Sequence, residues 1–382
     1  MGDAPQLDPC SAGGSGMSMV RGWCPTAHRP MAAGDGLLVR VRPRLARMTR
    51  AQAIGLSEAA AEHGNGAIDV TNRANLQIRG VRDDRWAALI ADLCALDLVD
   101  ADPASETRRA VIVAPDWHDG DDTHRIAVEL AQRLAELPEL PGKFGVAIDA
   151  GAAPVLGDAP ADIRIERAAA GGLILRADGR AWGVPLAVGA EIDAVVALAR
   201  WFVGTGGSAA GRMARHAVTL PAWADGVIPA APSRPAPATG PHAQGTVVGL
   251  AFGRIEAPDL AKLAMAARGV RVTPWRRLIV EGNVDTGQPA SALLRADACV
   301  GAPACPQASV ATRPLAVRLA PHVDGRLHVS GCAKGCARAQ AADVVLTGRD
   351  GRFDLAFAAG AGAPPAVSGL DPVQILARFG AD

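Results

Sequence analysis

The sequence lacks the segments that would place the protein in a membrane, on a secretory route or on nucleic acid. Its first residues are polar and glycine-rich, without the apolar core of a signal peptide. No apolar run is long enough to cross a bilayer, since even residues 187–203 include Glu191, Asp193 and Arg200. The formal net charge is zero, which argues against nucleic-acid binding. We therefore expect a cytoplasmic protein with reduced thiols.

The sequence also lacks two patterns that identify enzyme sites from spacing. No Gly-x-Gly-x-x-Gly loop opens a βαβ unit, so direct nicotinamide binding is unsupported. No nucleophile, histidine and acid stand at a spacing that indicates a catalytic triad. The catalytic residues are therefore unknown from the sequence.

The composition is that of a globular protein with several domains: 382 residues, 49% of them hydrophobic and 20% charged. The charge is unevenly distributed. Residues 21–82 contain ten arginines against four acidic residues, whereas residues 116–166 contain eleven acidic residues against four basic ones. Solvated surface explains such a pattern. An arginine-rich part also suits an anionic ligand, because the planar guanidinium binds a carboxylate with two hydrogen bonds.

Hydrophobic periodicity and capping signals predict a βαββα unit near the N-terminus, and the same order recurs later in the chain. The first helix is predicted to begin at a capping box formed by Thr49 and Gln52, and to end before Gly64. We expect the first unit to contain strands 37–42, 67–70 and 76–80 and helices 49–63 and 83–96. We expect the second to contain strands 246–252, 270–273 and 276–281, a helix from Pro258 and a helix over 291–297. The repetition predicts duplication with pseudo-twofold symmetry.

The rest of the chain predicts an α+β protein. Between the units we expect strands over 110–114, 143–148, 163–166, 173–176 and 181–184, with helices over 122–137 and 191–203. Terminal strands are expected over 343–347 and 353–358. The predicted organisation is a disordered tail (1–20), a first half-unit (21–100), an α+β domain (101–223), an exposed Ala/Pro linker (224–245), a second half-unit (246–290) and a cysteine-bearing α+β domain (291–382).

Four of the seven cysteines stand in two pairs near the C-terminus, Cys299-x5-Cys305 and Cys332-x3-Cys336. Both pairs lie in segments rich in glycine and alanine. Four thiolates are the ligand set of an iron–sulfur cluster or a structural zinc. The wide spacing favours the bulkier cluster, because zinc sites usually use Cys-x2-Cys. Two disulfides or four unrelated thiols are the other interpretations, and disulfides are disfavoured without a secretory signal.

The segments around these cysteines, 298–306 and 329–338, resemble the cluster motif of the sulfite/nitrite reductase family, whose members hold a [4Fe-4S] cluster against a siroheme. The resemblance covers nearly the whole chain from Arg21 onward. It implies a duplicated α+β fold with two ferredoxin-like half-units and a [4Fe-4S] cluster on the four cysteines. The stretch 71–77 resembles the family motif that lines the macrocycle, which implies ligand contacts for Arg73, Asn75 and Gln77.

Three basic residues match the cations that hold a small oxyanion in the reductases. Arg42 resembles the first-strand arginine, with Arg40 as the alternative in another register. Arg109 resembles the arginine that opens the next domain, and Lys143 resembles the first lysine of a Lys-Phe-Lys motif. The second lysine of that motif is Gly145 here. Losing a cation weakens the stabilisation of an oxyanion, which counts against sulfite reduction.

These departures favour the branch of the family that modifies precorrins, the precorrin-3B synthases. The resemblance then implies a monooxygenase of aerobic cobalamin biosynthesis that converts precorrin-3A to precorrin-3B by O2-dependent hydroxylation at C20 and closure of a lactone. It also implies a mononuclear non-haem iron and NADH as the electron source, delivered by a separate NADH-dependent donor. Trp275, in the second unit, either stacks on the macrocycle or packs in a core.

Two patterns offer further metal donors, and neither is assigned to the iron. Cys24-x3-His28 has a plausible metal spacing, but such residues near prolines are more often structural or exposed. The segment 118–124 contains histidines and aspartates, for which an acidic loop that caps the next helix is the simpler explanation.

Two other functions remain open. A siroheme-dependent sulfite or nitrite reductase would use Cys336 to bridge the cluster and the siroheme iron. A non-catalytic iron–sulfur electron carrier would need neither the paired domains nor the arginine-bearing strands.

Overall fold

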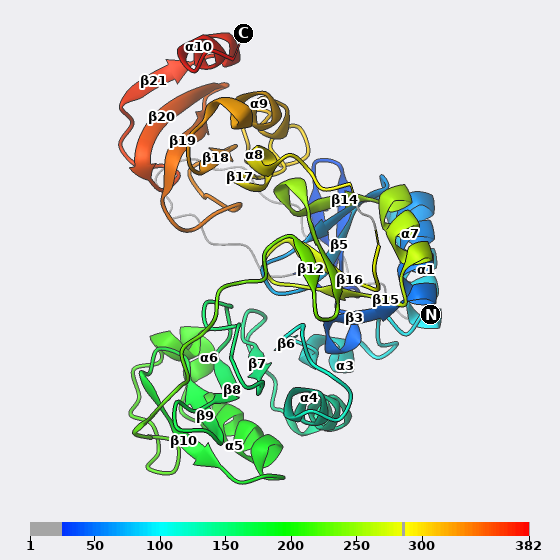
Figure 1. Cartoon of the computed structure of the whole chain (residues 1–382), viewed down its shortest axis with the longest axis vertical. Helices are drawn as coiled ribbons and strands as arrows, with labels where there is room; N and C mark the ends of the chain where they lie inside the picture. Colours follow the sequence, from blue (N-terminus) through cyan, green and yellow to red (C-terminus); the bar gives the residue numbers. More distant parts are fainter. Residues whose placement is uncertain (1–24, 285–286, 382) are drawn as a thin grey trace, which may run out of the picture.

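The chain folds into four β-sheets flanked by helices (Figure 1). The computed structural model describes residues 25–284 and 287–381. The predicted disordered tail and Cys24 lie outside the described residues. Two of the sheets are antiparallel and two are mixed, so the α+β prediction is confirmed. No helix in the described ranges is both long enough and apolar enough to cross a bilayer.

The first sheet belongs mainly to the first βαββα unit. Its helix α1 begins after the predicted capping box, in which Thr49 Oγ1 accepts from Gln52 N and Gln52 Oε1 accepts from Thr49 N. The sheet order is β1 (Met31–Ala33), β2 (Gly36–Val41), β5 (Leu76–Val81), β4 (Ala67–Val70) and β14 (Arg254–Glu256). The helices of this part are α1 (Arg50–His63), α2 (Asp83–Ala95) and α3 (Pro103–Arg108).

The second sheet repeats this arrangement with the second unit. Its order is β12 (Gly240–His242), β13 (Gly245–Gly249), β16 (Arg277–Glu281), β15 (Gly269–Val272) and β3 (Arg47–Thr49), with helix α7 (Ala257–Ala266). All neighbouring strands in both sheets are antiparallel.

The two units exchange one strand each. Strand β3 of the first unit pairs with β15, where Met48 lies opposite Val270, and β14 of the second unit pairs with β4, where Ile255 lies opposite Ile68. Each exchanged strand follows a 3-10 turn, η1 (Arg44–Ala46) or η4 (Ala251–Gly253), and leads directly into α1 or α7. The exchange covers an edge of each sheet that would otherwise be unpaired. As a result, α1 packs on α7 and one hydrophobic core serves both units.

The other two sheets share one pattern of strand directions. The six-stranded sheet has the order β11 (Ile228–Pro229), β10 (Trp182–Leu186), β9 (Leu173–Ala177), β8 (Ile163–Arg167), β7 (Val146–Asp149) and β6 (Val111–Val113). The C-terminal sheet has the order β17 (Ala296–Ala298), β18 (Leu327–Ser330), β19 (Ala342–Arg349), β20 (Arg352–Ala359) and β21 (Val367–Leu370). In each sheet the first three strands in sequence are parallel neighbours and the following ones are antiparallel.

Helices pack beside each of these sheets, and each sheet has its own core. The six-stranded sheet carries α4 (Asp122–Gln132), η2 (Leu134–Glu136), α5 (Glu191–Gly204), α6 (Gly207–Ala210) and η3 (Met213–Arg215). The C-terminal sheet carries α8 (Ser291–Leu294), α9 (Arg313–Leu319), η5 (Ala320–His322) and α10 (Pro372–Arg378).

Several predicted elements are wrong in extent. The helix predicted over 291–297 ends at Leu294, and its last residues form β17 in the parallel part of the sheet. The helix predicted over 122–137 ends at Gln132 and continues only as a 3-10 turn. The strand predicted over 246–252 ends at Gly249, because Phe252 adopts a left-handed turn with φ of +57°. The segment 224–245 contributes the edge strands β11 and β12, so it is more than an exposed linker.

Replacing Met48 by alanine tests the shared core. Met48 is fully buried in the core common to both units, so Met48→Ala is expected to lower the free energy of unfolding by about 2–5 kcal/mol. Hydrogen exchange should become faster in both α1 and α7. Met265→Ala is the control, because Met265 is 60% exposed on α7. Faster exchange in α1 alone would contradict a common core.

Candidate functional site

The two cysteine pairs follow neighbouring parallel strands. Cys299 comes directly after β17 and Cys332 comes shortly after β18, and these strands pair with Ala298 opposite Val329. The carboxyl ends of parallel strands meet at one edge of a sheet, which is where ligands of such sheets commonly bind. The two loops therefore lie side by side. The backbone N–H of Gly331 donates a hydrogen bond to Cys299 Sγ at 3.1 Å.

Glycines allow the two loops to approach. Gly301 has a φ of +71°, and a Cβ on it would lie 2.7 Å from Thr312 Oγ1. A Cβ on Gly331 would lie 2.5 Å from Ala308 Cβ. The N–H of Ser309 donates to the Gly331 carbonyl at 3.1 Å. A side chain at Gly331 would force the two loops apart, whereas one at Gly301 would distort the first loop itself.

The four thiols influence one another. Burial is the largest cause that raises the pKa of Cys336, and the neighbouring Cys332, Cys299 and Cys305 raise it further against the opposing effect of Lys334. Each cysteine in the described part of the chain is a free thiol, so no disulfide joins these four. Four cysteine sulfurs become a donor set for a cationic metal centre once they lose their protons. Within the described ranges, no group of three or more His, Cys, Asp and Glu side chains is arranged to hold a metal ion.

A buried carboxylate holds both cysteine segments in place. Asp297, just before Cys299, lies 2.8 Å from Arg276 Nη1, 3.1 Å from Arg326 Nη1 and 3.5 Å from Arg338 Nη1. Arg338 lies just after Cys336, and Arg276 comes from the turn before β16. Arg276 also donates to the carbonyl of Ala337. One carboxylate thus connects both cysteine loops to the second unit.

The first unit also contacts the cysteine loops. The N–H of Gly34, in the β1–β2 hairpin, donates to the Ala304 carbonyl at 2.9 Å. A Cβ on Gly34 would lie 2.2 Å from the Pro303 carbonyl oxygen, so only glycine allows this approach. The loop between Cys299 and Cys305 is therefore covered by the hairpin.

Strand β2 presents arginines on the face opposite the core. Val39 and Val41 are fully buried in the core, and Arg40 and Arg42 alternate with them. Arg40 lies opposite Gln77 of β5 in the sheet register. Arg40 is only 8% exposed, and its Nε has no hydrogen-bond partner. A buried cation with an unsatisfied donor is suited to an anionic ligand.

Arg42 and Arg109 are brought together on a buried glutamate. Arg42 Nη1 donates to the Glu106 carbonyl at 2.8 Å and lies 3.3 Å from its Oε1, and Arg109 Nη1 donates to Oε2 at 2.9 Å. Burial lowers the pKa of Arg42 to about 10, against the opposing effect of Glu106. An anionic ligand at this position would meet one net positive charge instead of two, so Arg40 is the better placed of the two β2 arginines.

The predicted macrocycle-lining stretch forms the tight turn between β4 and β5. Thr71 N donates to the Asn75 carbonyl at 2.9 Å, Thr71 Oγ1 accepts from Asn75 N at 3.2 Å, and Ala74 has a φ of +52°. Asn75 is buried, whereas Arg73 and Gln77 are half-buried. The turn therefore fixes the backbone from which Arg73 extends.

Lys143 and Gly145 lie before β7 in the next domain. Lys143 is half-buried. Arg73 Nη1 lies 3.3 Å from the position that a Cβ on Gly145 would take. The structure thus places the predicted cations in two groups, Arg42 with Arg109, and Arg73 beside the segment 143–145.

Three other features that the sequence offered as ligand or metal contacts make contacts within the fold. Trp275 is half-buried and packs against an apolar cluster that includes Ile112 and Ala147, so it belongs to a core between domains. His28 Nε2 is hydrogen-bonded to the Asp100 carbonyl at 2.7 Å. In the segment 118–124, Asp121 accepts from the N–H of His124 at 2.7 Å, which is the predicted helix cap.

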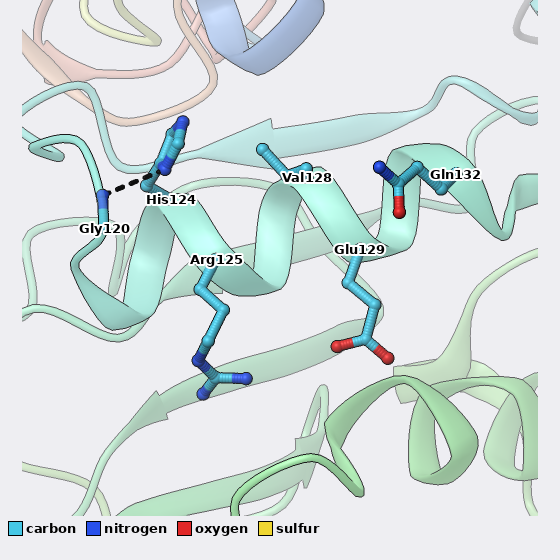
Figure 2. Close-up of a pocket in the computed structure, with 6 residues that line it drawn as sticks. All are labelled: Gly120, His124, Arg125, Val128, Glu129 and Gln132. Carbon is cyan, nitrogen blue, oxygen red and sulfur yellow. Dashed lines mark hydrogen bonds between the residues drawn. The ribbon is translucent and has the colours of Figure 1, made fainter.

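An open hollow of about 430 Å³ runs along α4, apart from the cysteines (Figure 2). His124 receives a hydrogen bond from Gly120 N at 3.1 Å and stacks on Trp117. Arg125 points the other way and pairs with Glu191 at 2.6 Å. The hollow has no unpaired cation and is not the best candidate for the ligand site.

Gly331→Ala tests the contact between the cysteine loops. The added Cβ would clash with Ala308, so we expect less than half of the wild-type iron and sulfide after anaerobic purification. Gly360→Ala is the matched control, because a Cβ there meets no atom within 4 Å. Equal iron and sulfide in both variants would contradict this account of the loops.

His328, in β18, makes stability depend on pH. It is fully buried, both ring nitrogens lack hydrogen-bond partners, and burial lowers its pKa from 6.5 to about 4. Between these values the unfolded chain binds a proton that the folded protein does not. The free energy of unfolding should therefore fall as the pH falls from 6.5 to 4, by up to about 3 kcal/mol. Denaturation of His328→Leu should show a smaller decline than that of His322→Leu, the exposed control. Equal declines would contradict the prediction.

Comparisons with known proteins agree with this architecture. Residues 29–96 match the family described as nitrite/sulfite reductase ferredoxin-like half domain. A "Precorrin-3B synthase" from Sinorhizobium sp. is 32% identical over 96% of this chain and 90% of its own. The structure of the Mycobacterium tuberculosis NirA protein is similar with a TM-score of 0.56, at 18% identity, over 88% of this chain and 77% of that one, which supports the fold alone. The chain therefore belongs to the precorrin-3B synthase family, among proteins with the nitrite/sulfite reductase ferredoxin-like half domain.

Proposed function

We propose that the protein is a precorrin-3B synthase of aerobic cobalamin biosynthesis. The observation that carries the proposal is the 32% identity to a precorrin-3B synthase over 96% of the chain. Two further observations support it: the two cysteine loops meet after β17 and β18, and the buried Arg40 has an Nε without a partner. In the proposed reaction, precorrin-3A receives one oxygen atom of O2 at C20 and closes a lactone, and the other oxygen leaves as water with two electrons and two protons.

In this proposal Cys299, Cys305, Cys332 and Cys336 hold a [4Fe-4S] cluster. Such a cluster supplies electrons one at a time, which suits the activation of O2. The electrons come from a separate NADH-dependent donor, because no Gly-x-Gly-x-x-Gly loop opens a βαβ unit in the sequence. We also propose a mononuclear non-haem iron as a second metal centre, and we assign no residues as its ligands. Asp297 and its arginines keep the cysteine loops in position.

The arginine-bearing face of β2, together with Arg73 and Lys143, binds the substrate. A precorrin is a large ring with carboxylates around its rim, and guanidinium groups are suited to carboxylates. Arg40, Arg73 and Lys143 supply positive charge, and Asn75 and Gln77 supply amide groups. Arg42 and Arg109 contribute less, since Glu106 neutralises part of their charge.

We further propose that the whole chain is a duplication with pseudo-twofold symmetry. The reciprocal exchange of β3 and β14 supports this, as does the common pattern of strand directions in the six-stranded and C-terminal sheets. The ligand site would then be unsymmetrical. Where the first unit has Arg40 opposite Gln77, the second has Val247 opposite Ile279.

Turnover with labelled oxygen tests the reaction. Wild-type protein with precorrin-3A, a reductant and ¹⁸O2 should give a product that carries one ¹⁸O atom, measured by mass spectrometry. Arg40→Ala should raise the KM for precorrin-3A about tenfold or more, because a hydrogen bond between charged groups is lost. Arg82→Ala is the control, since Arg82 is in an exposed ion pair with Asp84.

Three results would separate the alternatives. Reduction of sulfite or nitrite by the wild-type protein would favour the siroheme-dependent reductase. Electron transfer without turnover of any of these substrates would favour the iron–sulfur carrier. An unchanged KM in Arg40→Ala would remove Arg40 from the substrate site.

A further inference from the structure

Gly145 is not required by the conformation of its backbone. Its φ does not fall in the left-handed range that favours glycine. A side chain at this position would meet two neighbours, the backbone of Ala110 and the guanidinium of Arg73. An added Cβ would lie 3.3 Å from Arg73 Nη1 and 3.1 Å from the Ala110 carbonyl oxygen. The absence of a side chain therefore provides space for the Arg73 guanidinium.

The backbone of Gly145 cannot easily move to make room for a larger residue. Its N–H donates to Asp162 Oδ2 at 3.0 Å, and its carbonyl accepts from Asp162 N at 2.7 Å and Ile163 N at 3.3 Å. Asp162 is fully buried and pairs with Arg212 at 2.8 Å. The Ala110 carbonyl is also held, because it accepts from Val146 N at 3.0 Å. The flexible end of Arg73 is therefore the neighbour that would give way to a side chain at position 145.

Arg73 reaches this position from another part of the fold. It extends from the turn between β4 and β5, where Thr71 Oγ1 accepts from Arg73 N at 3.3 Å. Gly145 directly precedes β7 of the six-stranded sheet. The guanidinium thus reaches from the first unit to the neighbouring domain, where its Nη1 lies 3.3 Å from the position that a Cβ on residue 145 would take.

We propose that Gly145 is a specificity-determining position that admits Arg73 into the substrate site. A guanidinium from the first unit then stands where a side chain of residue 145 would otherwise project. Its planar fork binds a carboxylate with two hydrogen bonds, whereas a lysine would offer a point charge. Gly145 and Arg73 together therefore favour the binding of a ligand with carboxylates on its rim over the binding of a small oxyanion. This inference rests on the proposed function and assigns the residues that select its substrate class.

A double-mutant cycle tests the inference. The probe is uroporphyrin III, a stable tetrapyrrole with carboxylates around its rim, and binding to the purified holoprotein is measured by fluorescence. Gly145→Ala and Arg73→Ala should each weaken binding about tenfold. The double variant should bind no more weakly than Arg73→Ala alone, because both changes act through the same guanidinium. A general loss of structure would not produce this lack of additivity.

Gly142→Ala is the matched control, because a Cβ there meets no atom within 4 Å. It should bind the probe like the wild type. Arg73→Lys provides a test that does not depend on Gly145→Ala folding. It keeps the charge without the fork, and it should also bind about tenfold more weakly.

The possible failures are distinguishable. Wild-type protein that does not bind the probe would overturn both the proposed function and this inference. Wild-type binding with additive effects of Gly145→Ala and Arg73→Ala would overturn the inference alone. Unchanged binding of the probe in Gly145→Ala or in Arg73→Lys would also overturn the inference and leave the proposed function standing.

Discussion

The candidate site depends on the parallel pairing of β17 with β18. This register places Cys299 and Cys332 after neighbouring strands, so that two loops far apart in the sequence meet at one sheet edge. Gly331 allows the close approach, and the buried carboxylate of Asp297 fixes both loops through arginines. A change in this register would separate the four thiols even if every cysteine were retained.

The exchange of β3 and β14 holds the two βαββα units together, as the β17–β18 pairing holds the two cysteine loops together. Because β3 and β14 each complete the sheet of the other unit, neither unit has a core of its own. Ion pairs occupy equivalent places with reversed charge: Asp69 with Arg79 in the first sheet, and Arg271 with Glu281 in the second. The two faces nevertheless differ, since only the first carries Arg40. In the proposed duplication the two halves thus present different surfaces to an unsymmetrical ligand, with Arg40 and Gln77 on one and Val247 and Ile279 on the other.

Sequence patterns predicted what depends on local interactions. The capping box at Thr49 and the central strands β2, β4, β5, β15 and β16 follow from short spacings. Contacts between distant residues were not predictable. Glu106 neutralises Arg42 across 64 positions, and the exchange of β3 and β14 leaves no local signal. The helix predicted over 291–297 is wrong because pairing with β18 makes its last residues a strand. The assignment of Arg73 and Gly145 to one site also needed the three-dimensional fold.

The most direct measurement is the metal and pigment content of anaerobically purified protein. We predict iron and acid-labile sulfide in the proportion of a [4Fe-4S] cluster, with some additional iron and no extractable siroheme. Extracted siroheme would make the tetrapyrrole a cofactor and return the protein to the reductases. Iron without sulfide, or zinc alone, would contradict the assignment of Cys299, Cys305, Cys332 and Cys336 on which the account rests.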